Sequence, residues 1–320
     1  MAGTHENSRG MSYGKKASAE QVSAGIDLSG RHAIVTGANT GIGFETARVL
    51  ALRGSSVTMA CRNLEKADTA RTRILEGGGG GIREDQLEVR ELDLASFESV
   101  RRFAAGFRES THALNLLMNN AGVMLPAVHR TPDDFDAHFA INHLGHFLLT
   151  NLLLDVLQAS APARVVCVSS DALAGASLTD RLEDLNWESR KYGGIRSYAD
   201  SKLMNVMFAV ELTRRMKGTG VVANALHPGI VDTELGRDQP WYMQIVGLLL
   251  VLMMKDPARG ASTSVYVATA PEYAGRGGLY FADNAEKATP KLATNAAACA
   301  RLWEISAELT GLSSSTSLAD

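Results

Sequence analysis

A tyrosine and a lysine stand four residues apart in the stretch SYADSK, at Tyr198 and Lys202. The residues around them have the spacing of an amphipathic helix, and side chains at positions i and i+4 of a helix lie on one face. An ammonium group beside a phenol favours the phenolate and so lowers the pKa of the tyrosine. The pair is therefore either a proton-transfer centre or two ordinary surface side chains, because the same spacing occurs by chance on many helices.

The elements that must position this pair alternate along the chain from Arg31 onward. Short apolar runs predict strands at residues 32–37, 56–60, 87–92, 114–118, 164–170, 221–226 and 278–281. Helical spacing predicts helices at 42–53, 63–75, from 96, at 133–159, 196–217 and 294–309. Continuously apolar strands that alternate with helices are typical of a parallel sheet covered on both faces. We therefore predict an α/β fold, a single doubly wound Rossmann-type sheet of about seven strands.

The chain shows no internal repeat and no break in composition that would divide it into two domains. We expect one domain at residues 28–311, a polar N-terminal tail at 1–27 and a disordered tail at 312–320. Within the first tail, residues 1 to about 17 are expected to be mobile. Ser18 and Gln21 have the spacing of a capping box, which predicts a short helix beginning there.

The composition argues against several classes of function. A net charge of −3 over 320 residues leaves no basic footprint for nucleic acid and no polybasic membrane segment. Three widely separated cysteines in apolar segments indicate buried thiols, not a metal cluster. The polar N-terminus lacks the apolar core of a signal peptide, and residues 241–254 are too short to span a bilayer. We expect a soluble cytoplasmic protein, in which residues 241–254 form a buried helix, a substrate lid or a peripheral membrane contact.

A glycine-rich turn, TGANTGIG at residues 36–43, follows the first predicted strand and opens the first long helix. Glycines at such a turn let the backbone approach a pyrophosphate, whose charge then meets the helix N-terminus. The spacing of Gly37, Gly41 and Gly43 differs from the usual dinucleotide fingerprint, and glycines also close tight turns without any ligand. The position between a strand and a helix favours the nucleotide site.

The end of the second predicted strand bears on the choice of cofactor. A ribose 2′-hydroxyl prefers an acidic partner there, but the sequence reads Met59-Ala60-Cys61-Arg62-Asn63, with no acid at the strand end. The planar guanidinium of Arg62 suits a 2′-phosphate instead. We therefore expect NADP(H) in preference to NAD(H), although Arg62 could also be an ordinary exposed side chain.

Five motifs follow one another along the chain: TGANTGIG, NNAG (119–122), VSS (168–170), YADSK (198–202) and HPGIVDT (227–233). Their order resembles the short-chain dehydrogenase/reductase family over roughly residues 28–310. Five further segments distinguish branches of the family: GFETARVLALRG, ACRN, NHLGHFLLT, SAPARVV and LWEISAELTG. They look most like the branch that holds retinol dehydrogenases and the WW-domain oxidoreductase. The sequence contains neither a WW domain nor the N-terminal membrane helix of many retinol dehydrogenases, so the specific biology of those proteins is not carried over.

The resemblance implies roles for the residues at matching positions. The implied catalytic group is Ser170, Tyr198, Lys202 and Asn142. The implied cofactor site consists of Gly37, Asn39, Thr40, Gly41, Ile42, Gly43, Arg62, Asp93, Leu94, Asn120, Ala121, Gly122, Tyr198, Lys202, Val231 and Thr233. Asp93 and Leu94 would face the adenine, and Val231 and Thr233 would hold the nicotinamide carboxamide.

In the family's reaction the cofactor supplies the hydride and the protein supplies the proton. Tyr198 would be the general acid in reduction and the general base in oxidation. Lys202 would tune the tyrosine and bind the nicotinamide ribose, Ser170 would hold the substrate oxygen, and Asn142 would position a water molecule. Ser169 competes with Ser170 for its role, and we favour Ser170 because it matches the second serine of the family's pair.

Two histidines, His143 and His146, lie three residues apart on a predicted helix, but no third metal ligand with suitable spacing appears, so no metal site is expected. The helix around 143–157 is apolar on more than one face, which suggests a buried contact on its second side. In the family the helices at this position and at 196–217 form a dimer interface, so a homodimer is expected.

The resemblance places a substrate lid at about residues 236–256, and the apolar character of 241–254 suits a retinoid, a steroid or a fatty aldehyde. The leading hypothesis is an NADP(H)-dependent oxidoreductase acting on a lipophilic alcohol or carbonyl. The alternative is an NADP(H)-binding scaffold or sensor of the same fold that acts through protein partners.

Overall fold

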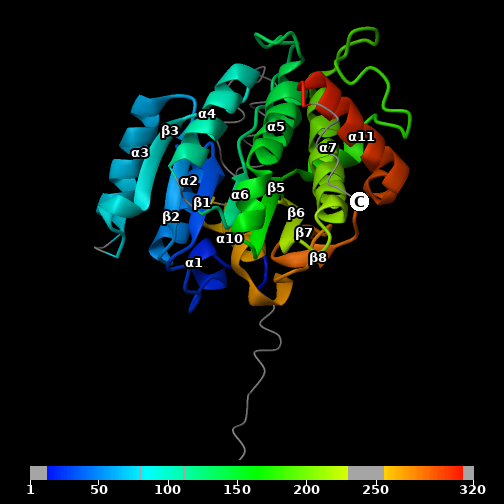
Figure 1. The fold of residues 1–320 in the computed structure, drawn as a ribbon. Helices are drawn as coiled ribbons and strands as arrows, with labels where there is room; N and C mark the ends of the chain where they lie inside the picture. The colour runs from blue at the N-terminus through cyan, green and yellow to red at the C-terminus, as the bar shows by residue number, and fades with distance from the viewer. Residues whose placement is uncertain (1–12, 79–80, 111–112, 230–255, 313–320) are drawn as a thin grey trace, which may run out of the picture.

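One sheet of eight strands runs through the centre of the computed structural model, which describes residues 13–78, 81–110, 113–229 and 256–312 (Figure 1). Its spatial order is β3-β2-β1-β4-β5-β6-β7-β8. The strands are β1 (His32–Thr36), β2 (Ser56–Cys61), β3 (Leu87–Glu91), β4 (Leu116–Asn119), β5 (Ala163–Val168), β6 (Val221–His227), β7 (Tyr280–Ala282) and β8 (Ala285–Lys287). Neighbouring strands pair in parallel, except that β8 is antiparallel to β7. The doubly wound α/β fold predicted from the sequence is confirmed.

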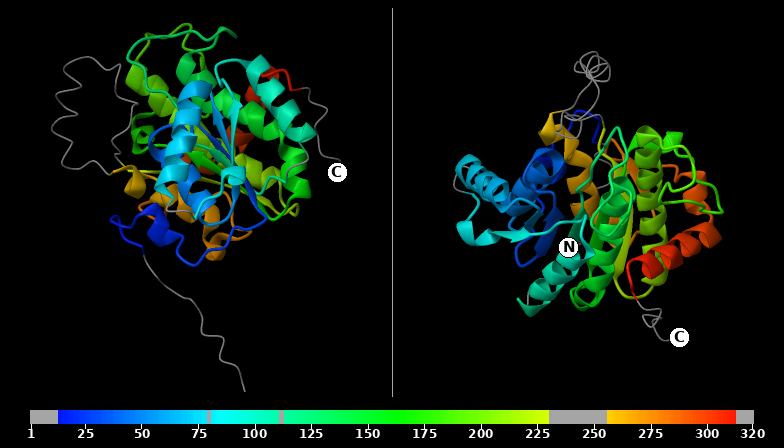
Figure 2. Two further views of the ribbon diagram at one scale, coloured as in Figure 1. Left: turned by 90° about the vertical axis from the view of Figure 1, so that its left-hand side faces the viewer. Right: turned by 90° about the horizontal axis from the view of Figure 1, so that it is seen from above.

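Helices cover both faces of the sheet (Figure 2). One face carries α1 (Ala19–Val22), α2 (Gly41–Leu52), α3 (Leu64–Gly77), α9 (Pro257–Gly260) and α10 (Ser262–Thr269). The other carries α4 (Phe97–Glu109), a π-helical segment η2 (His138–Leu144), α5 (Gly145–Leu152), α6 (Leu154–Ala159), α7 (Gly194–Arg215) and α11 (Ala296–Leu309). Short 3-10 turns lie at η1 (Glu84–Gln86), η3 (Asp171–Gly175), η6 (Pro271–Tyr273) and η7 (Lys291–Thr294).

Successive strand residues enter different cores, as the two-residue period of a strand requires. Ile34 of β1 packs in the core under α4, α5 and α7, whereas its neighbour Val35 packs in the core under α2 and α10. Val165 and Val166 of β5 divide in the same way. Because both faces are buried, both sets of positions are apolar, which is why the strands appear in the sequence as continuous apolar runs.

The eighth strand was not expected. Residues Ala285–Lys287 are exposed and carry the sequence AEK, which has neither alternation nor β-branched side chains. Pairing with Tyr280–Ala282 across a turn in which Asp283 and Asn284 both have positive φ makes it a strand. Tertiary context therefore decides this element, not local propensity.

The predicted helix at 133–159 is wrong at its start and along its length. Asp134 has a φ of 62°, in the left-handed region, so the chain turns before the helix begins. The carboxylate of Asp136 then accepts hydrogen bonds from the backbone N–H groups of His138 (3.1 Å) and Phe139 (3.3 Å) and so caps the helix. The helix begins with the π-helical η2, continues as α5, and is interrupted at Leu153 before α6.

The N-terminal segment is packed from Tyr13 onward, where a mobile tail was expected to about residue 17. The ring of Tyr13 meets the ring of Tyr266 on α10 at a centroid distance of 5.8 Å, and Asn284 donates to the carbonyl of Gly14. The capping box at Ser18 is present, since Gln21 N donates to Ser18 Oγ (3.3 Å) and Ser18 N donates to Gln21 Oε1 (2.9 Å).

The second apolar side of α5 is covered by the same chain. Trp303 of α11 packs against Phe147 of α5 (centroids 4.9 Å apart) and Phe208 of α7 (5.7 Å). At the same interface His143 Nε2 lies 2.9 Å from Ser306 Oγ. The apolar helix surface that suggested a homodimer is therefore occupied within the monomer and gives no argument for a second copy there.

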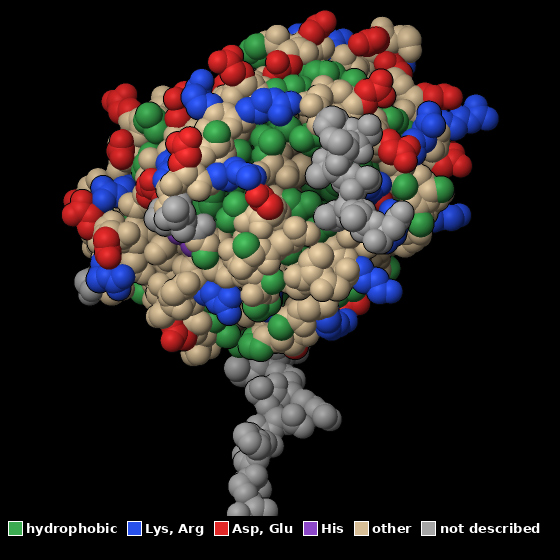
Figure 3. Space-filling model, viewed as in Figure 1, with side chains coloured by type: hydrophobic (Ala, Val, Ile, Leu, Met, Phe, Trp, Pro, Cys, Tyr) green, Lys and Arg blue, Asp and Glu red, His purple; other side chains and the backbone are tan. Residues whose placement is uncertain are grey.

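The face shown in Figure 3 mixes basic and acidic side chains without a large area of one charge. No helix within the described ranges is long and apolar enough to cross a membrane. The expected lid at about 236–256 lies outside the described residues except for Asp256, and so does the apolar stretch 241–254.

Candidate active site

The predicted site residues gather at the carboxyl ends of the central strands, where β1 and β4 lie side by side. The chain leaves β1 towards β2 and leaves β4 towards β5, so the loops after these two strands diverge and leave a crevice. In open parallel sheets ligands bind at this switch point. The glycine turn, the loop after β4 and the serines after β5 all lie there.

The glycine turn after β1 fits a close backbone approach. Gly37 and Gly41 have φ values of 66° and 56°, which glycine adopts without strain. A side chain at Gly43 would lie 2.2 Å from the carbonyl oxygen of Gly37 and 2.5 Å from Nδ2 of Asn120. Ile42 is buried, and Asn39 and Thr40 are partly exposed at the start of α2. Two backbones therefore meet here with no room for a side chain, as a pyrophosphate site at a helix N-terminus requires.

Thr36 joins this turn to the loop after β4. Its Oγ1 accepts hydrogen bonds from the backbone N–H groups of Asn120 (2.9 Å) and Ala121 (3.0 Å). Its proton has two acceptors within reach, the carbonyl of Met118 (3.2 Å) and Nε2 of His146 (2.9 Å); Nε2 accepts because the other ring nitrogen, Nδ1, must donate to the carbonyl of Asn142 (3.2 Å). Burial lowers the pKa of His146 to about 3, so the ring is neutral and this assignment holds. One hydroxyl thus links the glycine turn and the loop after β4 to α5.

The end of β2 carries the residues expected to choose the cofactor. Arg62 is exposed there and forms no ion pair or hydrogen bond within the ranges that the structure describes. Cys61 is buried beneath the glycine turn, where burial raises the pKa of its thiol to about 11, opposed by the backbone N–H groups of Ala38 and Asn39. The guanidinium of Arg62 is therefore accessible to a ligand at the end of β2.

Asp93 and Leu94, expected to face an adenine, follow the end of β3. Asp93 Oδ1 accepts from the N–H of Ala95 (3.0 Å), and its own N–H donates to Ser99 Oγ (3.0 Å). The carbonyl of Leu94 would lie 2.7 Å from a side chain at Gly145. The first turn of α5 is therefore pressed against this loop, which fixes its position.

Tyr198 and Lys202 lie on α7 with their side chains buried, at 9% and 3% exposure. The Lys202 ammonium donates to the carbonyl of Val168 at the end of β5 (3.1 Å) and lies 5.6 Å from the centre of the Tyr198 ring. Burial lowers the pKa of Lys202 to about 8. A charge held this deep with a single protein acceptor among the described residues is suited to bind a polar ligand group.

Asn142 lies in the π-helical η2 and uses its whole amide. Its Oδ1 accepts from the N–H of Val123 (2.8 Å), and its Nδ2 donates to the carbonyl of Val123 (3.0 Å) and to Ser201 Oγ (3.0 Å). A side chain at Gly122 would lie 3.2 Å from both Asn142 Oδ1 and Lys202 Nζ. Asn142, Lys202 and the loop after β4 therefore converge on one point.

The two serines after β5 have different partners. Ser169 is buried and donates to the carbonyl of Lys202 (2.6 Å), so it stabilises α7. Ser170 is partly exposed, accepts from the N–H of Ala172 (3.2 Å), and lies near enough to the Tyr198 phenol to lower its pKa. The geometry favours Ser170 for contact with a substrate oxygen.

The pKa of Tyr198 differs from the expectation. Burial raises it above its usual range, and Ser170 opposes that rise only in part. The ammonium of Lys202 was expected to lower it, but desolvation of the phenol has the larger effect in the protein alone. Tyr198 is consequently protonated at neutral pH and ready to donate.

Other predicted residues separate from this group or lie outside the described residues. His143 pairs with Ser306 and His146 with Thr36, so the two rings do not share a ligand. Within the described ranges no group of three or more His, Cys, Asp or Glu side chains could hold a metal. Val231 and Thr233 lie outside the described residues.

Thr36, His146 and Ser201 contribute to the site but were not expected from the sequence. Ser201 Oγ accepts from Asn142 and donates to the carbonyl of Tyr198 (2.7 Å). The signal was present for Ser201, which lies inside the SYADSK stretch, one residue before the lysine. Thr36 precedes the first glycine of the turn, and His146 follows Asn142 by one helical turn.

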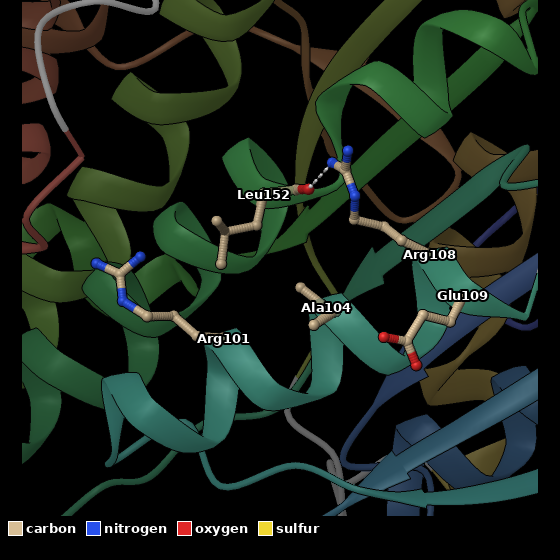
Figure 4. A pocket seen from close by; sticks show the side chains of 6 residues that line it. Arg101, Ala104, Arg108, Glu109 and Leu152 are labelled. Carbon is tan, nitrogen blue, oxygen red and sulfur yellow. Dashed lines mark hydrogen bonds between the residues drawn. The ribbon is translucent and has the colours of Figure 1, made fainter.

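A hollow of about 440 Å³ lies elsewhere, between α4 and α5 (Figure 4). It is lined by Arg101, Ala104, Ala105, Arg108, Glu109 and Leu152, and Arg108 donates to the carbonyl of Leu152 (3.1 Å). None of the predicted catalytic or cofactor residues lines this hollow, so it is distinct from the candidate site.

Comparison with known proteins agrees with this geometry. The family model for short chain dehydrogenase matches residues 31–178. Retinol dehydrogenase 13 of Homo sapiens is 44% identical over 290 residues, covering 89% of this chain and 86% of that protein. Retinol dehydrogenase 12 of Homo sapiens is 42% identical over 90% of this chain and 88% of that protein. A crystal structure of an uncharacterized protein from Mycobacterium paratuberculosis superposes with a TM-score of 0.73 at 35% identity, covering 91% of this chain and 97% of that one.

Proposed function

The chain belongs to the short-chain dehydrogenase family, in the branch of the retinol dehydrogenases, and we propose that it moves hydride between NADP(H) and a lipophilic alcohol or carbonyl compound. Family membership makes it a short-chain alcohol dehydrogenase that uses a nicotinamide cofactor. The preference for NADP(H), the lipophilic substrate and the roles of individual residues are the proposal.

One observation carries the proposed mechanism. The Lys202 ammonium and the amide of Asn142 both lie at Gly122, next to a glycine turn that fits a pyrophosphate, and the protonated Tyr198 lies beside Lys202. This arrangement supports the proposal that these side chains hold a nicotinamide ribose and a substrate oxygen, as their counterparts do in the family. The cofactor, when bound, supplies or accepts the hydride.

In reduction, Tyr198 donates its phenolic proton to the carbonyl oxygen. Ser170 donates a hydrogen bond to the same oxygen, where negative charge develops. Lys202 stabilises the phenolate that remains and binds the ribose hydroxyls. Asn142 holds Val123 and Ser201 and so fixes the loop and the helix that carry the reacting groups. In oxidation the proton moves the opposite way.

Replacement of Tyr198 by phenylalanine tests this mechanism. We expect Tyr198→Phe to lower kcat by about 10²- to 10⁴-fold, the usual contribution of general acid catalysis, while the Kd for NADPH changes little. Tyr266→Phe on α10 is a matched control, because it also removes one buried phenol but outside the site. Comparable turnover in Tyr198→Phe and the control would refute the assignment.

The preference for NADP(H) rests on Arg62. Its exposed guanidinium at the end of β2, together with the lack of an acid at that strand end, supports binding of a 2′-phosphate. We expect Arg62→Ala to raise the KM for NADPH at least about tenfold and to leave the KM for NADH nearly unchanged, since one charge-assisted contact contributes 1.5–3 kcal/mol. Arg83→Ala is the control, being an exposed arginine paired with Asp85. Equal effects on the two cofactors would exclude the assignment.

The substrate class rests on the relatives and on the apolar stretch 241–254. Two relatives are named retinol dehydrogenases, which supports a retinoid among the candidate lipophilic substrates. We expect kcat/KM for all-trans-retinal to exceed that for propanal at least about 100-fold, because each buried methylene contributes about 0.8 kcal/mol. A preference for the short aldehyde would contradict a lipophilic site.

A homodimer, a peripheral membrane contact and a cytoplasmic location stay predictions. Because Trp303 of α11 packs on α5 and α7, we expect a homodimer to use another surface, and sedimentation at micromolar concentration would detect it. Flotation with liposomes would detect a membrane contact by residues 241–254. Fractionation of cells would test the location.

A further inference from the structure

A second polar network lies beside Tyr198. It contains Asp136, His138 and Ser197, all buried, together with the half-buried Tyr192. The ring of His138 meets the ring of Tyr198 edge to face, with centroids 5.9 Å apart and an interplanar angle of 69°. Ser197 is the chain neighbour of Tyr198. Neither residue belongs to the catalytic group that the sequence predicts.

The direction of each hydrogen bond in this network is fixed by its ends. At one end the N–H of Leu125 can only donate, so the Nε2 atom of His138, 2.8 Å away, must be an unprotonated acceptor. At the other end the Asp136 carboxylate can only accept, so Ser197 Oγ donates to it (2.7 Å). His138 Nδ1 therefore carries the ring proton and can donate it to Ser197 Oγ or to the hydroxyl of Tyr192, each 3.2 Å away.

The charges near the ring agree with this assignment. Burial lowers the pKa of His138 to about 4, against the opposing effect of Asp136, and Lys202 and His129 lower it further. The imidazole is neutral at physiological pH, as the bond from Leu125 requires. Protonation of Nε2 would place its N–H opposite the N–H of Leu125, two donors with no acceptor between them.

The network repeats the pattern that Asn142 makes one helical turn later. His138 and Asn142 are four residues apart on η2, and their partners Ser197 and Ser201 are four residues apart on α7. On the opposite side the same two η2 residues hold Leu125 and Val123 of the loop after β4. Two parallel sets of hydrogen bonds, one through His138 and one through Asn142, therefore join the loop, η2 and α7. The backbone of Tyr198 lies between them.

We propose that His138 is a positioning residue for the hydride-transfer reaction: as the neutral Nδ1–H tautomer it fixes the positions of the Tyr198 ring and of the loop at Leu125 relative to the cofactor crevice. Because a misplacement of the proton donor by about 1 Å can cost 10²-fold in rate, loss of the His138 hydrogen bonds affects turnover more than substrate binding. The inference rests on the proposed function, since it assigns a role within that same site.

Two replacements of His138 distinguish its hydrogen bond to the loop at Leu125 from its contacts with α7. His138→Phe keeps a ring beside Tyr198 but removes both hydrogen bonds. His138→Gln places its side-chain oxygen near the position of Nε2 and so can still accept from Leu125. We expect His138→Phe to lower kcat for NADPH-dependent reduction of all-trans-retinal at least about tenfold with KM within about threefold of the wild type. We expect His138→Gln to recover most of that loss.

A second readout does not need turnover. Hydrogen exchange of the backbone around Leu125, followed by mass spectrometry of peptides covering 122–127, reports whether the N–H is held. Exchange there is expected to be at least about tenfold faster in His138→Phe and near the wild-type rate in His138→Gln. His143→Phe is the matched control, because His143 is an equally buried ring that bonds Ser306 instead.

The outcomes are distinct. If the wild type reduces retinal and His138→Phe has the same kcat, the positioning role is overturned. An equal loss of kcat in His138→Phe and His138→Gln overturns it too. Unchanged exchange at Leu125 in His138→Phe overturns the hydrogen-bond network itself. If the wild type reduces no retinal, the proposed substrate class fails, and the exchange measurement still decides whether His138 holds the loop.

Discussion

Three buried neutral histidines make the fold sensitive to mild acid. Burial lowers the pKa of His138 to about 4 and of both His143 and His146 to about 3, from a reference value of 6.5. The unfolded chain binds a proton at each ring as the pH falls through about 6.5, whereas the folded chain does not until the pH nears 4 or 3. The unfolded state then binds more protons, so the free energy of unfolding decreases as the pH falls through this window.

The size of the effect follows from these values. Each pKa unit corresponds to about 1.4 kcal/mol, so at pH 5 each ring destabilises the fold by about 2 kcal/mol relative to pH 7.5. The three rings together give about 6 kcal/mol, which is comparable with the whole stability of a typical domain. At Asp184 burial raises the pKa, but backbone hydrogen bonds from Glu188, Arg190 and Ser189 lower it below its usual value on balance, so its contribution is lost only at a pH below this window.

Urea unfolding followed by tryptophan fluorescence at pH 7.5, 6.5, 5.5 and 5.0 measures this loss. His143→Phe is the informative variant, because its ring packs among Phe139, Phe147 and Phe208 and its Nδ1 atom has no hydrogen-bond partner in the described part of the chain. We expect this variant to lose about 2 kcal/mol less than the wild type between pH 7.5 and 5.0. A wild-type loss below about 1.5 kcal/mol, or an equal loss in the variant, would refute the reasoning.

Three further substitutions test particular contacts. Gly122→Ala should lower kcat about tenfold with little change in melting temperature, because the new methyl group lies 3.2 Å from Lys202 Nζ and Asn142 Oδ1; steady-state kinetics and calorimetry check this. Thr36→Val should destabilise the fold by about 1–3 kcal/mol in urea unfolding by leaving backbone donors unsatisfied, whereas Thr36→Ser should not. Trp303→Ala should lower the free energy of unfolding by up to about 3 kcal/mol and expose the apolar side of α5, and sedimentation should then show concentration-dependent association.

The parts of the fold that the sequence predicts are those encoded by local pattern. Apolar strands, helical spacing and the glycine turn are repeated or contiguous in the chain, and the structure has the seven expected strands and the doubly wound class. The eighth strand, AEK, depends on pairing with β7 and carries no such pattern. The start of the helix near 133 was misplaced because Asp136 caps it from within an otherwise helix-compatible run.

The same distinction holds within the site. Tyr198 and Lys202 were visible because their spacing is local and a known family shares it. Ser197 and Ser201 lie in the same short stretch, but their partners His138 and Asn142 are 59 residues away in sequence. A hydrogen bond between such distant residues depends on the packing of two helices, which single-sequence patterns do not encode. The direction of the Tyr198 pKa was missed for a related reason, because burial is a tertiary property.

The π-helical segment η2 explains how three residues on one helix can serve the site together. His138, Asn142 and His146 are spaced by four, and in a regular α-helix each step of four turns the side chain by about 40°, or about 80° over both steps. A π-helical turn has an extra residue per hydrogen-bonded ring and winds less per residue, which offsets this drift. His138 and Asn142 can therefore both reach α7 and the loop after β4, while His146 still reaches Thr36. The irregular turn is thus the feature that aligns the cofactor loops with Tyr198, and a straight α-helix of the same sequence would move at least one of these side chains away from its partner.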